Sequence, residues 1–128
     1  MNLWARRFLG LAMWVAIAPL AWSAATLRGV EVDAATANGA RITLRASGPV
    51  AEKVFSLDSP HRLVVDLPAT KLADGLALPK SAGPVKAVRS GLQPGSTLRL
   101  VFEHAGIAWK VRDAGAGVIV IEFGNAIG

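Results

Sequence analysis

The chain has 128 residues, 14 Lys and Arg against 9 Asp and Glu, and no cysteine. Without cysteine it has neither disulfide bonds nor thiolate metal sites, so an apolar core must hold the fold together. The formal net charge of +5 is only mildly basic, which argues against the dense basic surface of a nucleic-acid-binding domain.

The first 25 residues have the pattern of a secretory signal peptide. Arg6 and Arg7 precede an apolar segment at residues 8–20, and small residues follow it. A membrane-spanning helix needs about 20 apolar residues, so cleavage is favoured over anchoring. Small residues allow cleavage after Ser23 or Ala25, and the arginine pair leaves both the general secretory route and the twin-arginine route open.

Removal of residues 1–25 leaves about 103 residues, enough for one domain with a core. We expect that domain to span residues 26–124, with residues 125–128 as a C-terminal tail or the start of a linker. Twelve basic and nine acidic residues then give a charge of +3. Trp109 is the only tryptophan left, so the platform on which nucleic-acid bases would stack is missing. No membrane span is expected after cleavage.

An internal repeat runs through the rest of the chain at an offset of 56–58 residues. Four blocks recur in the same order: 27–30 with 85–88, 40–45 with 96–101, 50–54 with 107–111, and 63–67 with 119–123. Two half-domains of about 40 residues therefore follow one template, and each is expected to contain four strands.

Apolar and polar residues alternate through these blocks with the period of two that is typical of β-strands. Ile42 and Leu44, for example, flank Thr43. Val64 and Val120 interrupt the alternation, because they are apolar on the face opposite their apolar neighbours. Such residues predict central strands whose outer face is partly covered.

Turn signals separate the predicted strands. Asn38-Gly39 predicts a hairpin, and Pro94-Gly95 suits the centre of a type II turn. Residues 68–84 join the halves and contain three leucines, so this segment is expected to lie along the core. Together these features predict an all-β fold: a sandwich of two similar four-stranded sheets with a pseudo-two-fold internal repeat.

No segment carries the residues of a familiar catalytic or metal site. The two histidines, His61 and His104, fall in different turns of the repeat and are expected to be exposed, whereas a zinc site needs three converging ligands. The glycine-rich residues 115–117 lack the lysine of a phosphate-binding loop. We therefore expect a chain that is not an enzyme and holds no metal or cofactor.

Arg62 and Asp66 share one face of a predicted strand, but about 13 Å separates them, so they cannot pair directly. One interpretation is structural: each forms an ion pair across strands, with Arg41, Arg45 or Lys53 as the partner of Asp66. The other interpretation is functional: the planar guanidinium of Arg62 faces an anionic ligand and holds a carboxylate by two hydrogen bonds.

Residues 54–68 resemble the signature of the AMIN domain, which precedes the catalytic domain of periplasmic N-acetylmuramoyl-L-alanine amidases and also occurs in pilus secretins. The residues of this sequence that match the motif are Leu57, Asp58, Pro60, Arg62 and Asp66. Residues 27–32 and 47–50 fit the surrounding pattern, so the resemblance covers residues 27 to about 123. The second half departs from the motif, since residues 112–118 lack the proline and the arginine.

The resemblance implies a two-sheet sandwich in the periplasm that binds peptidoglycan and places an amidase at the division septum. Zinc would belong only to the catalytic domain of such an amidase, which this sequence does not contain. The alternative is a protein-interaction module of a secretin or another envelope assembly, with envelope or division proteins as partners.

Peptidoglycan stem peptides carry carboxylates, which a mildly basic domain should attract. We expect Arg62 to be the main anchor, supported by Arg41, Arg45 and Lys53 on neighbouring strands. Exposed charge pairs contribute only about 0.2–1 kcal/mol each, so binding is expected to be weak at each site and sensitive to salt.

Overall fold

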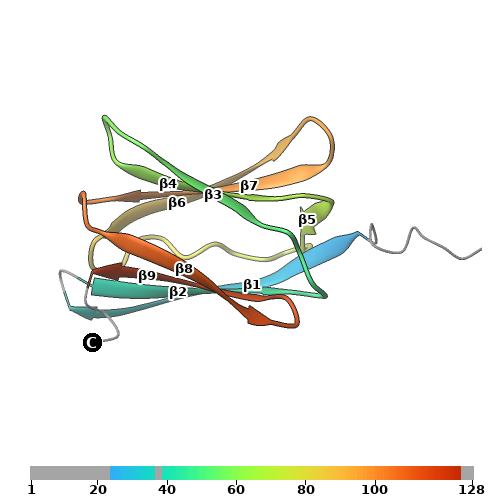
Figure 1. The fold of residues 1–128 in the computed structure, drawn as a ribbon, viewed down its shortest axis with the longest axis horizontal. Coiled ribbons are helices and arrows are strands. Elements are labelled where there is room, and N and C mark those ends of the chain that lie inside the picture. The colour runs from blue at the N-terminus through green and yellow to red at the C-terminus, as the bar shows by residue number, and fades with distance from the viewer. Residues whose placement is uncertain (1–23, 37–38, 125–128) are drawn as a thin grey trace, which may run out of the picture.

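The computed structural model describes residues 24–36 and 39–124 (Figure 1). In this part the chain forms nine strands and no helix, and therefore has no helix that could cross a membrane. The strands are β1 (Ala25–Thr36), β2 (Gly39–Ala46), β3 (Lys53–Leu57), β4 (Arg62–Leu67), β5 (Thr70–Leu72), β6 (Val85–Gln93), β7 (Thr97–His104), β8 (Trp109–Gly115) and β9 (Val118–Gly124).

The strands make two stacked sheets, as Figure 1 shows. One sheet has the order β5-β1-β2-β9-β8 and the other the order β3-β4-β7-β6. All neighbours are antiparallel except β1 and β5, which are parallel. The predicted all-β sandwich is confirmed. The prediction lacked β5, because a strand of three residues is too short to show an alternating pattern.

The two halves of the repeat exchange hairpins between the sheets. The first half contributes β1–β2 to the five-stranded sheet and β3–β4 to the four-stranded sheet. The second half contributes its first hairpin, β6–β7, to the four-stranded sheet and its second, β8–β9, to the five-stranded sheet. The central pairs, β2 with β9 and β4 with β7, therefore join one half to the other. This arrangement is the pseudo-two-fold relation that the repeat predicted.

The structure corrects one block of the repeat. Arg41 lies opposite Glu122, and Arg99 lies opposite Asp66, so Arg41 and Arg99 are equivalent at an offset of 58. The sequence comparison aligned residues 40–45 with 96–101 at an offset of 56. A shift of two residues keeps every side chain on the same face of its strand, so apolar alternation alone cannot detect it.

The core lies between the sheets and is built from the inward residues of both halves. Its fully buried members are Leu27, Ala40, Ile42, Leu44, Leu63, Val65, Leu67, Val85, Leu100, Phe102, Ile121 and Phe123. Leu72, Leu76 and Leu78 of the connecting segment pack against this core, as predicted. Val64 and Val120 are also buried although they point outward, which confirms that the outer faces of the central strands are partly covered.

Some sequence predictions fall wholly or partly outside the described residues. They are residues 1–23 of the signal peptide predicted at 1–25, the turn residue Asn38 and the tail at 125–128. Ala25, one of the two candidate cleavage positions, is buried in β1 and donates its N–H to the Ala69 carbonyl at 2.8 Å. The predicted turn at Pro94-Gly95 is present, with a φ of +84° at the glycine.

Gly117 is the tightest point of the β8–β9 turn. A Cβ atom there would lie 2.6 Å from the Gly48 carbonyl oxygen and 2.8 Å from that of Ala46, and φ is +84°. Gly115 has nearly the same φ, +86°, but nothing lies within 4 Å of its Cβ position. A substitution at Gly115 therefore tests backbone strain alone, whereas the same substitution at Gly117 tests backbone strain together with a steric clash.

We predict that Gly117→Ala lowers the free energy of unfolding by at least about 2 kcal/mol more than Gly115→Ala, because both alanines strain the backbone but only the first also meets two carbonyl oxygens. Urea denaturation of the two variants measures the difference. Equal losses would contradict the close contact between this turn and the chain at residues 46–48.

Candidate functional site

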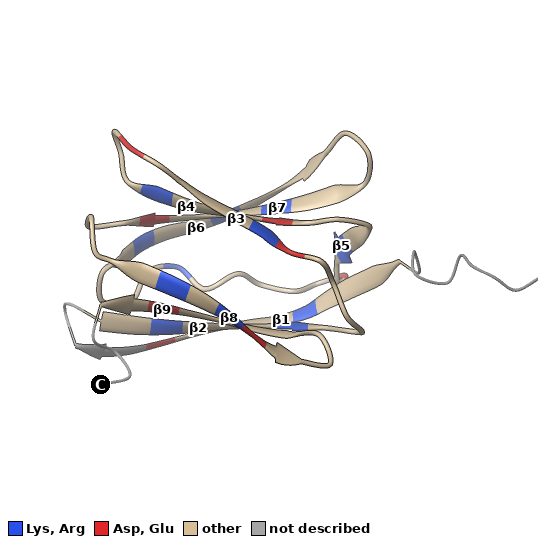
Figure 2. Cartoon of the chain, viewed as in Figure 1, with Lys and Arg blue, Asp and Glu red and all other residues tan. Residues whose placement is uncertain are grey.

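The outward side chains of β3, β4, β6 and β7 form a surface that we call the four-stranded face. It consists of Lys53, Phe55, Leu57, Arg62, Val64, Asp66, Arg89, Arg99, Val101 and Glu103. The corresponding five-stranded face includes Glu31, Asp33, Arg41, Thr43, Arg45, Lys71, Lys110, Arg112, Val120 and Glu122. Figure 2 shows that basic residues lie on both sheets rather than on one.

Asp66 and Arg99 form the shorter of the two ion pairs between strands of the four-stranded face. Arg99 donates from Nε and Nη2 to the two carboxylate oxygens of Asp66, at 2.8 and 2.9 Å. These hydrogen bonds, and then the charges of Arg99 and Lys53, lower the pKa of Asp66 although partial burial opposes the shift. The cross-strand ion pair expected for Asp66 is present, but its partner is Arg99 rather than Arg41, Arg45 or Lys53. Lys53 of β3 lies directly opposite Asp66, on the side of β4 away from Arg99.

The same arrangement occurs on the five-stranded face around Glu122, which is only 4% exposed. Lys110 and Arg112 approach its carboxylate oxygens at 4.0 and 3.7 Å, and Arg41 lies opposite it on β2. The Nε atom of Arg41 is buried and has no hydrogen-bond partner among the described residues. An acidic residue between two basic ones is thus a shared feature of both faces.

Arg62, the predicted anchor, is held by the β3–β4 turn. Its Nε donates to the Pro60 carbonyl at 3.1 Å and its Nη2 to the Asp58 carbonyl at 3.3 Å. In this chain the guanidinium therefore links two carbonyl groups of the turn that precedes it. A guanidinium has five N–H donors, so others remain available to a ligand on the four-stranded face.

The structure separates the four predicted anchors. Lys53 and Arg62 lie on the four-stranded face, whereas Arg41 and Arg45 lie on β2 of the other sheet. The prediction that Arg41 and Arg45 support Arg62 from neighbouring strands is therefore wrong, because hairpin exchange places β2 next to β1 and β9. Arg45 instead forms an exposed ion pair with Glu31 at 3.6 Å.

Two apolar residues of the four-stranded face were not predicted to contribute to binding. Phe55 lies opposite the buried Val64, with the Arg99 guanidinium 5.6 Å from its ring centre. Leu57, predicted only as part of the motif, is 40% exposed. The signal that could have identified both is their spacing: Lys53, Phe55 and Leu57 alternate along β3 and so share one face.

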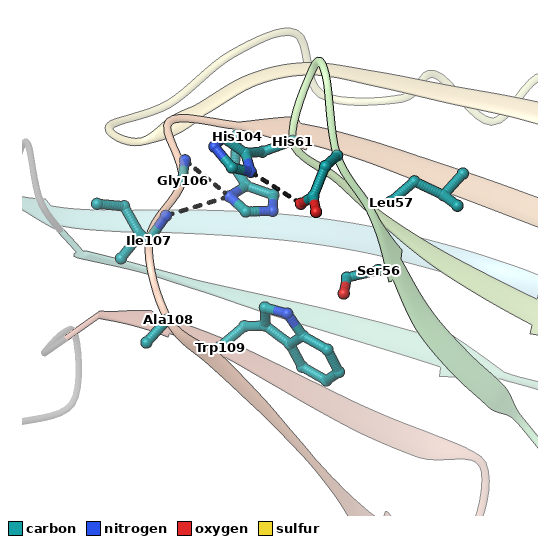
Figure 3. A pocket seen from close by; sticks show the side chains of 9 residues that line it. Ser56, Leu57, His61, His104, Gly106, Ile107, Ala108 and Trp109 are labelled. Carbon is teal, nitrogen blue, oxygen red and sulfur yellow. Dashed lines mark hydrogen bonds and ion pairs between the residues drawn. The ribbon is translucent and has the colours of Figure 1, made fainter.

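A separate cleft of about 520 Å³ opens where β3 and the β3–β4 turn approach the β7–β8 connection (Figure 3). The residues that line it are Ser56, Leu57, Asp58, His61, His104, Gly106, Ile107, Ala108 and Trp109. The rings of His61 and His104 stack with centres 5.8 Å apart. The cleft thus combines two imidazoles, an indole and a carboxylate.

His104 corrects one expectation, because it is only 6% exposed rather than an exposed turn residue. The two histidines do lie in different turns, and His61 is exposed as expected. The two rings nevertheless stack, because β4 begins beside the end of β7. Among the described residues, no group of three or more His, Cys, Asp or Glu is placed to hold a metal ion.

Burial, and then the proximity of His61, lowers the pKa of His104 from its ordinary value of 6.5. The unfolded chain therefore binds a proton at this residue more readily than the folded chain does. The stabilisation from neutral His104 is present above pH 6.5 and is lost as the pH falls through the lowered pKa.

We predict that the free energy of unfolding decreases between about pH 7.5 and pH 5, and that His104→Asn removes part of this decrease. Urea denaturation at a series of pH values measures it. His61→Asn is the control and should keep most of the slope, because burial, the larger cause of the lowered pKa of His104, remains. An unchanged slope in His104→Asn would contradict the assignment.

Comparison with known families agrees with the resemblance seen in residues 54–68. The model of the AMIN domain matches residues 29–122, which run from β1 to β9 and include the four-stranded face and the cleft. No curated protein matches the chain.

Proposed function

Because this chain belongs to the AMIN-domain family, we propose that it is a non-catalytic module that binds peptidoglycan in the periplasm. In this role it would place an N-acetylmuramoyl-L-alanine amidase on the wall at the division site. The observation that carries the proposal is the four-stranded face, which is built around the family motif at residues 57–66.

The four-stranded face offers peptidoglycan two kinds of contact, basic side chains and exposed apolar surface. Four basic residues outnumber two acidic ones, so the face attracts the carboxylates of stem peptides. The six are Lys53, Arg62, Arg89, Arg99, Asp66 and Glu103. Phe55 and Leu57 add apolar surface, which removes water from the contact and strengthens nearby charge interactions.

The five-stranded face lacks the features that distinguish its counterpart. By register, Arg112 occupies the position equivalent to Phe55, and Val118 the position equivalent to Arg62. Ion pairs engage basic residues on both faces: Arg89 and Arg99 on the four-stranded face, and Arg45, Lys110 and Arg112 on the five-stranded face. The residues that distinguish the four-stranded face are therefore Phe55 and Arg62. We therefore assign peptidoglycan binding to the four-stranded face alone.

The proposal predicts that purified chain binds to isolated sacculi and that binding decreases from about 0.05 to 0.5 M salt, because screening weakens exposed charge contacts. The double variant Lys53→Ala with Arg62→Ala should bind at least about threefold more weakly, since each exposed contact contributes about 0.2–1 kcal/mol and the repeating polymer multiplies the loss. A pull-down with sacculi measures both effects.

The matched control is Lys110→Ala with Arg45→Ala, which removes the same charge from the five-stranded face and should bind like the unaltered chain. Equal losses in the two double variants would mean that net charge, not the four-stranded face, causes binding. Absence of binding at any salt concentration would refute the proposal and favour the protein-interaction alternative.

A further inference from the structure

The cleft beside the four-stranded face contains groups that the proposed binding to that face leaves unused. Its volume of about 520 Å³ falls within the range of about 300–1,000 Å³ of small-molecule sites. Figure 3 shows His61 and His104 on one wall and Trp109 across from them, with Ser56 of β3 at the side.

His104 presents a buried donor without an acceptor. The N–H groups of Gly106 and Ile107 donate to its Nδ1 at 3.1 and 3.3 Å, so the proton of the neutral ring is on Nε2. Nε2 is buried and has no hydrogen-bond partner in the part of the chain that the structure describes. In Figure 3 this nitrogen lies on the side of the ring that faces Trp109 and Ser56. A ligand that supplies an acceptor there would satisfy the donor.

Trp109 forms the opposite wall. It opens β8 opposite Phe123 and is half-buried, since it packs partly against the core while lining the cleft. An indole held in this way offers a rigid, flat and apolar surface to a ligand ring. Because the indole already packs against the core, it has less conformational freedom to lose on binding.

The rim of the cleft disfavours an anion. The carboxylate of Asp58 lies in the lining and approaches Nδ1 of His61 at 3.3 Å, with 83% of its side chain exposed. A carboxylate-bearing ligand would meet this charge at the entrance, whereas a neutral ligand with hydroxyl groups can donate to it. The chemistry of the cleft thus differs from that of the basic four-stranded face.

We propose that the cleft binds a neutral N-acetylated sugar, with the pyranose ring on Trp109 and the acetamido carbonyl oxygen accepting a hydrogen bond from His104 Nε2–H. The inference rests on the proposed function, since the glycan strand of peptidoglycan consists of N-acetylated sugars. The protein would then hold a strand at two points: the sugar in the cleft and the stem peptides on the four-stranded face.

The test uses the full chain with Trp4, Trp14 and Trp22 replaced by Phe, so that fluorescence reports on Trp109 alone. Titration with the β-1,4-linked tetramer of N-acetylglucosamine should change the emission in a saturable way. The glucose tetramer, which has no acetamido group, should bind at least about tenfold more weakly because it leaves the donor unpaired. A free stem tetrapeptide should have no effect on the emission.

Two substitutions at His104 isolate the donor. The amide of His104→Asn can accept the N–H groups of Gly106 and Ile107 but does not reach the position of Nε2, so affinity for the N-acetylglucosamine tetramer should fall about tenfold. His104→Gln places an amide N–H near that position and should retain most of the affinity. Thermal unfolding confirms that each variant folds; if neither does, the Nε2–H resonance of the unaltered chain should shift on addition of the tetramer.

The outcomes separate this inference from the proposed function. Binding to sacculi without a response to the N-acetylglucosamine tetramer would overturn the sugar site and leave the four-stranded face intact. A response to the tetramer without binding to sacculi would refute the proposed function instead. Equal responses to the two tetramers, or a response to the stem peptide, would overturn the assignment of ligand class.

Discussion

The exchange of hairpins between the two halves is the constraint on which the rest of the structure depends. Each sheet is completed by pairing a strand of one half with a strand of the other, β2 with β9 and β4 with β7. Since no cysteine links the halves, these central pairs and the core between the sheets hold the domain together. Neither half buries both of its inner faces by itself.

This exchange also explains why the two outer faces share one arrangement of charged residues but differ in the side chains around it. The repeat places an acid between basic residues on both, as Asp66 beside Arg99 and as Glu122 opposite Arg41. The faces differ around that framework, because Phe55 and the motif arginine occur only on the four-stranded one. The ends of the hairpins then bring β3 and β8 close together, which creates the cleft at Trp109.

The sequence was enough to predict what depends on local pattern. Alternation and turn residues predicted the strands, the repeat predicted the symmetry, and the three leucines of the connecting segment predicted its contact with the core. Which strands become neighbours depends on long-range pairing, so the grouping of Arg41 with Arg62 was wrong. The burial of His104 was missed for the same reason: its partners, His61 and Phe123, come from distant parts of the chain.

The central claim is that binding is confined to the four-stranded face and the adjoining cleft. The most direct measurement is an NMR titration of the ¹⁵N-labelled chain with soluble disaccharide-tetrapeptide fragments of peptidoglycan. The account predicts that amide shifts change along β3, β4 and the β7–β8 connection, together with the indole N–H of Trp109. Changes centred on β2 and β9 of the five-stranded face would contradict it.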